Sequence, residues 1–297
     1  MRQVIWKHKR WFGYSLYCIL ITMVFLYYRF PSDALRDYLE ATLVKINPQM
    51  HLSIGKVSPA WPFSMKLMEP RLSVKESPGT VLFRAERLMI RPHIWSFIQG
   101  KSTYGFKCLA YGGNLEGRIH FLKNRWGTPF TTSMTLKNIR IDNTFLPNMI
   151  DRRLAGILGG TIEYEGKDKF LRDGTGEANL KLSHGRIDLS QPLLGLESVD
   201  LKELLIKMVL KKKTIDLSNV ELKGESMHGT VSGFVRLREE FLKSGLDLRG
   251  TIEPFADLLK KLERYGNRIQ FFKKHLKKGK LSFIIRGTIG GPKIQFI

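Results

Sequence analysis

The sequence is poor in the residue patterns that form disulfides and metal sites. It has two cysteines, Cys18 and Cys108, which lie far apart and have no second cysteine or histidine at a metal-ligand spacing. Its seven histidines are scattered and never form an HExxH motif. Zinc ligands come in closely spaced sets and a structural disulfide needs a paired framework, so this pattern argues against both.

Motifs for nucleotide binding and for hydrolysis are also missing. The sequence has no GxxxxGK[ST] loop and no G-x-S-x-G elbow, and Gly174 and Gly176 are not followed by a third glycine at the dinucleotide spacing. Carboxylate pairs such as Asp200 and Glu203, or Glu239 and Glu240, could in principle serve acid–base chemistry, but sequence neighbours of this kind are usually solvated. We therefore expect a protein that is not an enzyme and that uses no cofactor or metal.

Acidic residues are scarce relative to basic ones. The 297 residues include 27 Asp or Glu against 49 Lys or Arg, which gives a formal net charge of +22. Hydrophobic residues make up 43% and aromatic residues 11% of the chain, enough for a packed core, which excludes a disordered protein. Because a single all-β domain can reach about 200 to 250 residues, we expect one large domain.

One long uncharged run lies near the N-terminus. Residues 11–28 read WFGYSLYCILITMVFLYY, and a helix of this length, at ~1.5 Å per residue, just spans a bilayer core. Aromatic residues lie at both ends, where they favour the headgroup interface, and the bulky residues that follow do not form a signal-peptidase site. The run predicts a retained transmembrane helix; the alternative is a buried helix of a soluble protein.

The charges around this run predict its orientation. Residues 1–10 contain four Lys or Arg and no acid, whereas the ten residues after the run mix both signs. The positive-inside rule then favours a cytoplasmic basic segment at 1–10 and an exported body. We expect the segment 29–50 to hold a membrane-proximal helix that begins near Asp33 and ends by Asn47, and the β domain to cover 51–297.

The body has the period-two alternation of β-strands. Leu180 and Leu182, for example, lie between polar residues, and glycines punctuate most such segments. The apolar phase shifts by one residue between Leu217 and Val220, which indicates a bulge in a long curved strand. We predict a mainly β fold: a long, curved, mostly antiparallel sheet with a few amphipathic helices.

Two segments have a helical period instead. Leu201, Leu204, Leu205, Met208 and Val209 have the spacing of one helix face and end at three lysines, and a second helix is expected from Pro254 to Gly266, with a shorter one through His275. We interpret both as helices that cap the sheet; partner-binding helices are the alternative.

Several motifs together resemble a known family. They are FPSDALRDYLEATL after the uncharged run, SPAWPF at 58–63, GTGEANLKLSHGRIDL at 174–189, GTVSGFVRLREEFLKSGLDLRG at 229–250 and LSFIIRGTIGGPKIQF at 281–296. With these motifs the chain resembles the type II secretion system protein N family, within the broader AsmA-like group of envelope proteins. The resemblance covers nearly the whole chain and is strongest in its last 125 residues.

The resemblance implies a place and two possible roles. It implies a single-pass protein of the Gram-negative inner membrane with a periplasmic β domain, acting as a non-enzymatic component or accessory of type II secretion that contacts secretion-system subunits. The AsmA-like kinship implies an alternative role, a lipid-binding or lipid-transfer module with an apolar groove for phospholipid. Candidate groove residues are Leu180, Leu182, Ile215, Leu217, Val220 and Leu222.

The positive charge needs a separate explanation, because only five Lys or Arg lie in the first 30 residues. Residues 256–280 are strongly basic and carry interleaved aromatics. Each Lys or Arg near an anionic membrane surface can contribute about 1 kcal/mol, so we expect contact with headgroups, and a solvated face is the alternative. A periplasmic glycan or nucleic-acid binder is a third alternative, although a tethered domain outside the cytoplasm would seldom meet nucleic acid. Candidate headgroup contacts are Lys260, Lys261, Arg264, Arg268, Lys273, Lys274, Lys277 and Lys278.

Overall fold

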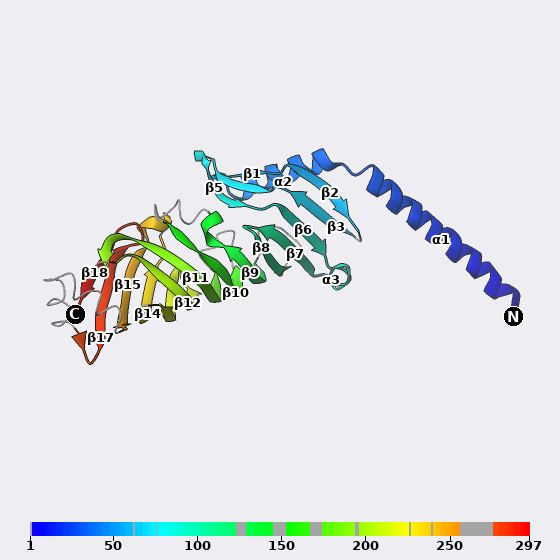
Figure 1. Cartoon of the computed structure of the whole chain (residues 1–297). Helices are drawn as coiled ribbons and strands as arrows, with labels where there is room; N and C mark the ends of the chain where they lie inside the picture. Colours follow the sequence, from blue (N-terminus) through cyan, green and yellow to red (C-terminus); the bar gives the residue numbers. More distant parts are fainter. Residues whose placement is uncertain are drawn as a thin grey trace.

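The computed structural model in Figure 1 describes the chain except residues 1, 62, 76, 123–128, 145–152, 167–173, 194–195, 226, 239 and 256–275. The described part forms a 15-stranded antiparallel sheet and a 3-stranded antiparallel sheet, with a few helices near the N-terminus. The prediction of a mainly β protein with a large antiparallel sheet is confirmed.

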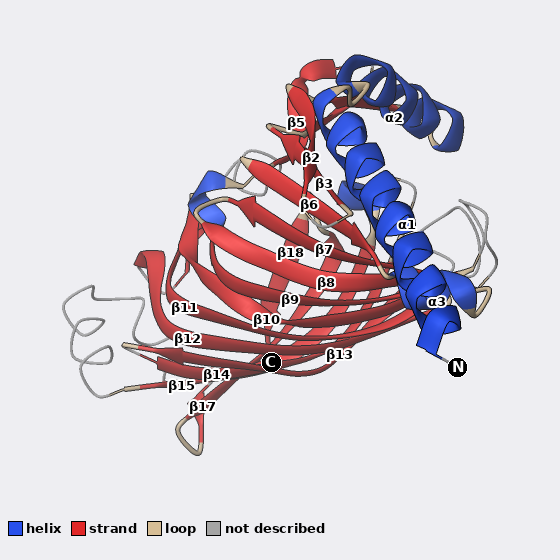
Figure 2. Cartoon of the chain, turned by 90° about the vertical axis from the view of Figure 1, so that its right-hand side faces the viewer, coloured by secondary structure: helices blue, strands red, loops and turns tan. Residues whose placement is uncertain are grey.

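The large sheet is a meander in which most strands pair with the strand that follows them in sequence. Figure 2 shows that it curls along its length. Its strands, in spatial order, are β2 (Lys56–Ala60), β3 (Ser64–Met68), β6 (Arg87–Pro92), β7 (Ser102–Ala110), β8 (Gly113–Phe121), β9 (Phe130–Arg140), β10 (Leu154–Gly166), β11 (Thr175–Leu193), β12 (Leu196–Lys211), β13 (Thr214–Gly224), β14 (Met227–Arg236), β15 (Gly245–Pro254) and β17 (Lys280–Thr288), and the last of these also pairs with β16 (Leu276–Lys277) and β18 (Pro292–Phe296).

The N-terminal part packs a helix against the first strands. Helix α2 (Ser32–Ile46) contributes Leu35 and Leu39 to a cluster around the buried Ile54 and Val57. The carboxylate of Glu40 on the same helix accepts a hydrogen bond from the backbone N–H of Ile54 at 2.9 Å. Beside this cluster lies the small sheet of β1 (Met50–Ser53), β4 (Arg71–Val74) and β5 (Ser77–Arg84), and α3 (Ile94–Ile98) follows β6. The helix expected between Asp33 and Asn47 is thus present.

The first helix, α1 (Arg2–Tyr28), includes the whole uncharged run at 11–28. Along this run many side chains are exposed, among them Leu16 (62%), Leu20 (57%) and Phe25 (66%). Across the residues that the structure describes, no helix combines the length and apolar character needed to cross a membrane.

The phase shift in β13 is a bulge, as expected. Leu217 pairs with Met208 and Gly233, and the next pairs in these ladders involve Asn219 and Val220, which leaves Ser218 as the extra residue. Because of this extra residue, Leu217 and Val220 point to the same face of the sheet although they are three residues apart.

The prediction of a helix over 201–209 is wrong, because these residues belong to strand β12. Nearly every position between Leu204 and Leu210 is apolar, so the segment fits a helical period and a strand period equally well, and pairing with β11 and β13 selects the strand. The lysines expected at a helix end form a hairpin turn instead, in which Lys212 (φ 46°) and Lys213 (φ 61°) are both left-handed. The helices expected at 254–266 and through 275 lie almost wholly outside the described residues.

Candidate functional site: the apolar inner face of the sheet

An unbroken line of apolar residues and glycines crosses the large sheet from one edge to the other. Each member is the cross-strand partner of the next, so all of them lie on the same face. With strands about 4.8 Å apart, the line extends roughly 60 Å over 14 strands. We call it the apolar row; its members are Val57, Leu67, Leu88, Cys108, Leu115, Leu136, Gly160, Leu180, Ile206, Val220, Val231, Gly250, Phe283 and Phe296.

The face that carries the apolar row is the more buried one, and we call it the inner face. On β11, Leu182 is 3% exposed, whereas the side chain of its neighbour Lys181 is 56% exposed. The same contrast holds on β15 and β17, where Leu248 and Phe283 are buried while Arg249 and Arg286 are exposed. At the N-terminal end this burial comes from α2 and the small sheet, because Leu39 and Leu52 pack against the cluster that contains Val57 and Leu67, and Phe83 packs against the cluster that contains Cys108. Over the later strands the burial fits a sheet that curls toward its own apolar side.

The six candidate groove residues all lie on the inner face. Leu180 and Val220 belong to the apolar row, and Leu182 and Leu222 flank it through their common partner Leu204. Leu182 is buried, and the other five keep intermediate exposure. The structure thus brings these residues together as a partly accessible apolar surface. The last two of the six candidate groove residues, Ile215 and Leu217, pair with Leu210 and Met208 of β12.

Glycines in and beside the apolar row make room for aromatic rings. A Cβ on Gly250 would meet the ring of Phe283 on β17, and a Cβ on Gly117 would meet the ring of Phe106 on β7. The ring of an aromatic residue therefore covers the bare backbone of a glycine on the neighbouring strand. In the sequence these glycines suggest only hairpin turns, and their place opposite aromatic residues becomes visible only with the strand register.

A second feature that the sequence did not reveal is a line of aromatic contacts at one edge of the inner face. Tyr104 contacts Phe121 with ring centroids 6.0 Å apart, Phe121 contacts Phe130 at 6.1 Å, and Phe130 contacts Tyr164 at 5.8 Å. The four rings come from β7, β8, β9 and β10. Neighbouring rings at such distances stabilise one another beyond simple burial, so they reinforce this edge of the sheet.

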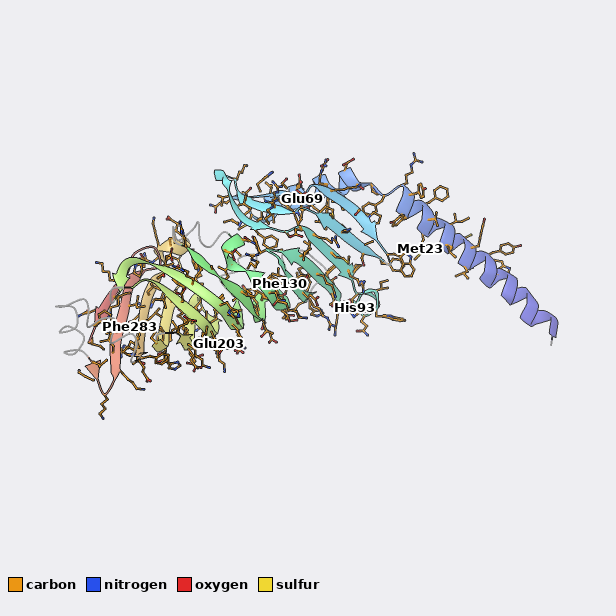
Figure 3. All side chains as sticks on the ribbon, viewed as in Figure 1. Met23, Glu69, His93, Phe130, Glu203 and Phe283 are labelled. Atoms are coloured by element: carbon orange, nitrogen blue, oxygen red, sulfur yellow. The ribbon has the colours of Figure 1, made fainter. Side chains whose placement is uncertain are left out.

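The opposite, outer face carries ion pairs. Glu203 on β12 bonds to Lys181 on β11 and to Lys223 on β13, the latter with Nζ and Oε2 3.3 Å apart. These hydrogen bonds, that from Lys181 above all, hold the pKa of the Glu203 carboxyl below its usual range. Figure 3 labels Glu203 of this face and Phe283 of the inner face. The large sheet therefore has a charged side and an apolar side.

A hollow of about 590 Å³ lies on the outer face and includes Arg118, Glu163 and Glu177. The two glutamates are direct cross-strand partners on β10 and β11, and both are exposed. Within the described ranges no group of histidine, cysteine, aspartate or glutamate side chains is arranged to hold a metal ion. Solvated carboxylates of this kind do not by themselves indicate a catalytic site.

The structure describes two of the eight candidate headgroup contacts. Lys277 and Lys278 are exposed at the β16–β17 turn, where Lys278 (φ 51°) and Gly279 (φ 77°) adopt left-handed conformations. These two lysines therefore stand at one end of the sheet, in a turn of defined shape. The other six, which lie outside the described residues, are Lys260, Lys261, Arg264, Arg268, Lys273 and Lys274.

Comparison of the chain with protein-family models, with curated proteins and with solved structures finds no match. Its function is therefore inferred from the geometry of this chain.

Proposed function

We propose that this protein is a membrane-anchored, non-enzymatic module that holds the acyl chains of phospholipids on the inner face of its curled sheet. The observation that carries the proposal is the apolar row, which has no polar side chain over 14 strands and keeps partial access to solvent at residues such as Leu180 and Val220. The accessible part of the row is its central stretch, where Leu180, Ile206, Val220 and Val231 all keep intermediate exposure, and a contiguous accessible apolar surface is typical of a binding site.

The described helices leave most of this face open to a ligand. Helix α2 packs on β1 and β2, and α3 packs on β7, so both lie at the N-terminal end of the sheet. A lipid tail on the open part would bury its methylene groups, each of which contributes about 0.8 kcal/mol. The lipid tail would lie along the apolar row, because the opposite face of the sheet is charged.

Basic residues at the strand ends suit the headgroup. The β12–β13 turn exposes Lys211, Lys212 and Lys213, and the β16–β17 turn exposes Lys277 and Lys278. A lipid whose tail lies on the inner face would place its phosphate near such an edge, where lysines attract anions. The two turns lie at opposite ends of the strands, so lysines that can attract the phosphate of an anionic phospholipid border the apolar face on both sides.

We further propose that α1 attaches the protein to the inner membrane, with its N-terminus in the cytoplasm and the β domain in the periplasm. The uncharged run, its exposed aliphatic side chains and the basic residues before it support this orientation. Alkaline phosphatase fused after Ile297 should be active in cells, because that enzyme folds only outside the cytoplasm. A stably expressed but inactive fusion would contradict the orientation.

A second candidate function is docking to subunits of a type II secretion system, as the resemblance in sequence implies. The observation that favours it is the strand β18, which pairs only with β17 among the described strands and exposes Ile294 (46%) beside its open edge. Such an edge can accept a strand from a partner. Because Ile297 donates its N–H to Ser282 of β17, the alternate residue Ile294 directs its N–H to the open edge, and Ile294→Pro should then reduce co-purification of secretion subunits without loss of bound phospholipid.

The lipid proposal is tested by mass spectrometry of the lipids that co-purify with the full chain. The test variant carries Ile206→Gln and Val220→Gln on the inner face, and the matched control carries Lys207→Gln and Asn219→Gln, the adjacent outward positions on the same two strands. Both variants keep α1, so lipid that merely surrounds the anchor is equal in the two. We expect the inner variant to lose bound phospholipid and the outer variant to retain it; equal amounts in both would refute the proposal.

A further inference from the structure

The β2–β3 turn presents two large aromatic side chains to solvent. Trp61 is 81% exposed and Phe63 is 55% exposed, and both lie in the SPAWPF motif. Phe63 holds a left-handed backbone conformation (φ 52°), which is uncommon for a bulky non-glycine residue and is found mostly in turns. Both rings therefore lie outside the core.

A second pair of exposed apolar side chains lies beside this turn. Ile94 (46% exposed) and Trp95 (75% exposed) begin α3, which directly follows β6. Strand β6 pairs with β3, and Nε of Arg91 donates a hydrogen bond to Oγ of Ser64 at 3.2 Å, next to Phe63. The turn and the helix therefore form one surface, which we call the aromatic tip: Trp61, Phe63, Ile94 and Trp95.

The surroundings of the aromatic tip are basic. Arg91, His93 and Lys101 are exposed around α3, and no acidic residue occurs in the sequence between Glu86 and Glu116. Tryptophan beside basic residues is the composition that proteins place at the headgroup level of anionic membranes. A surface that binds another protein more often carries charges of both signs.

The aromatic tip also lies at the end of the molecule from which α1 projects. In Figure 1 the ends of β2 and β3 and the short helix α3 form the right-hand end of the sheet, on the side of α1, and Figure 2 shows α1 and α3 on the same side of the molecule. The C-terminal strands β14 to β18 lie at the opposite end. A membrane that holds α1 is therefore nearest to the aromatic tip.

We propose that the aromatic tip inserts into the interface of the anionic bilayer that holds α1. With α1 it makes two points of attachment, which fix the angle of the sheet so that its N-terminal strands meet the lipid surface. This inference rests on the proposed membrane anchor.

The test measures the depth of the two tip tryptophans in the full chain, reconstituted in vesicles of anionic and zwitterionic phospholipid. Changing Trp6, Trp11 and Trp126 to phenylalanine leaves Trp61 and Trp95 as the only indoles. Lipids brominated near the headgroup quench an indole that lies in the interface. We expect strong quenching and a blue-shifted emission.

The matched control places the indole in another connection at the same ends of the strands, but far from the aromatic tip along the sheet. It carries Trp61→Phe, Trp95→Phe and Phe241→Trp in the same background, and Phe241 is an exposed residue (47%) between β14 and β15. Strands β3 and β14 are nine pairings apart, about 43 Å at ~4.8 Å per strand, so the control indole should remain unquenched.

The outcomes separate the inference from the anchor on which it rests. If the protein resists carbonate extraction but Trp61 and Trp95 are not quenched, the aromatic tip does not insert, whereas the anchor stands. Equal quenching of the control indole would mean that the whole edge lies on the bilayer, which also overturns the inference. A protein that carbonate removes from the vesicles contradicts the anchor, and the inference fails with it.

Discussion

Leu180 and Leu182 provide a paired test, because they lie on one strand and one face but differ in burial. Leu182 is 3% exposed and packs with Ile141 and Leu201, whereas Leu180 keeps intermediate exposure. Truncating a buried leucine to alanine removes its transfer free energy and leaves a cavity, at a cost of about 2–5 kcal/mol. Truncating Leu180 should cost on the order of 1–2 kcal/mol, since part of its surface already meets solvent.

The two variants should therefore rank in opposite order in two assays. In urea unfolding of the purified full chain, followed by circular dichroism, Leu182→Ala should lower the transition midpoint much more than Leu180→Ala; a domain of ordinary stability, about 5–15 kcal/mol, would survive both. In phospholipid retention, Leu180→Ala should have the larger effect because its side chain is accessible to a ligand. If Leu182→Ala were as mild as Leu180→Ala in urea, the close packing of Leu182 against Ile141 and Leu201 would be wrong.

Three further predictions concern single residues. Gly250→Ala should lower the thermal unfolding midpoint by an amount equivalent to about 1–3 kcal/mol, because its methyl group would occupy the place of the Phe283 ring; an unchanged midpoint would contradict the ring's position. The pKa of Glu203 is lowered by its two lysine partners, so its contribution to stability should be present above about pH 4.3 and be lost as the pH falls through the lower folded-state value. The stability difference between the wild type and Glu203→Gln should shrink in acid, and a difference that grows in acid would contradict the lowered pKa. Burial raises the pKa of the Cys108 thiol to about 11, so in a Cys18→Ser variant, which removes the exposed second thiol, maleimide should label Cys108 slowly at neutral pH until urea unfolds the sheet; rapid labelling of that folded variant would show that this position of the apolar row is open.

The β architecture could be predicted from the sequence because its signal is local. Alternation such as that around Leu180 and Leu182 reports which side of a strand is apolar, and the phase shift between Leu217 and Val220 is enough to predict the bulge in β13. Helix α2 could also be predicted from the sequence, because its apolar face and its end at Asn47 are encoded within fifteen residues.

The errors and omissions have a common physical cause, which is that partners across strands are not visible in a linear sequence. The run from Leu204 to Leu210 has apolar residues at nearly all positions, so only its pairing with β11 and β13 decides between helix and strand. The apolar row likewise depends on the register of 14 strands, and the contact of Phe283 with Gly250 joins residues 33 positions apart. Burial differs between Leu180 and Leu182 for the same reason, because it depends on how the sheet curls.

The central claim is that acyl chains lie on the inner face of the sheet. It is tested most directly by placing the photo-crosslinking residue benzoylphenylalanine at Ile206, a member of the apolar row, or at the adjacent outward position Lys207, and irradiating living cells that make the full chain. Mass spectrometry should find a phospholipid adduct at position 206 and none at position 207. Absence of a lipid adduct at 206, or equal adducts at both positions, would contradict the account.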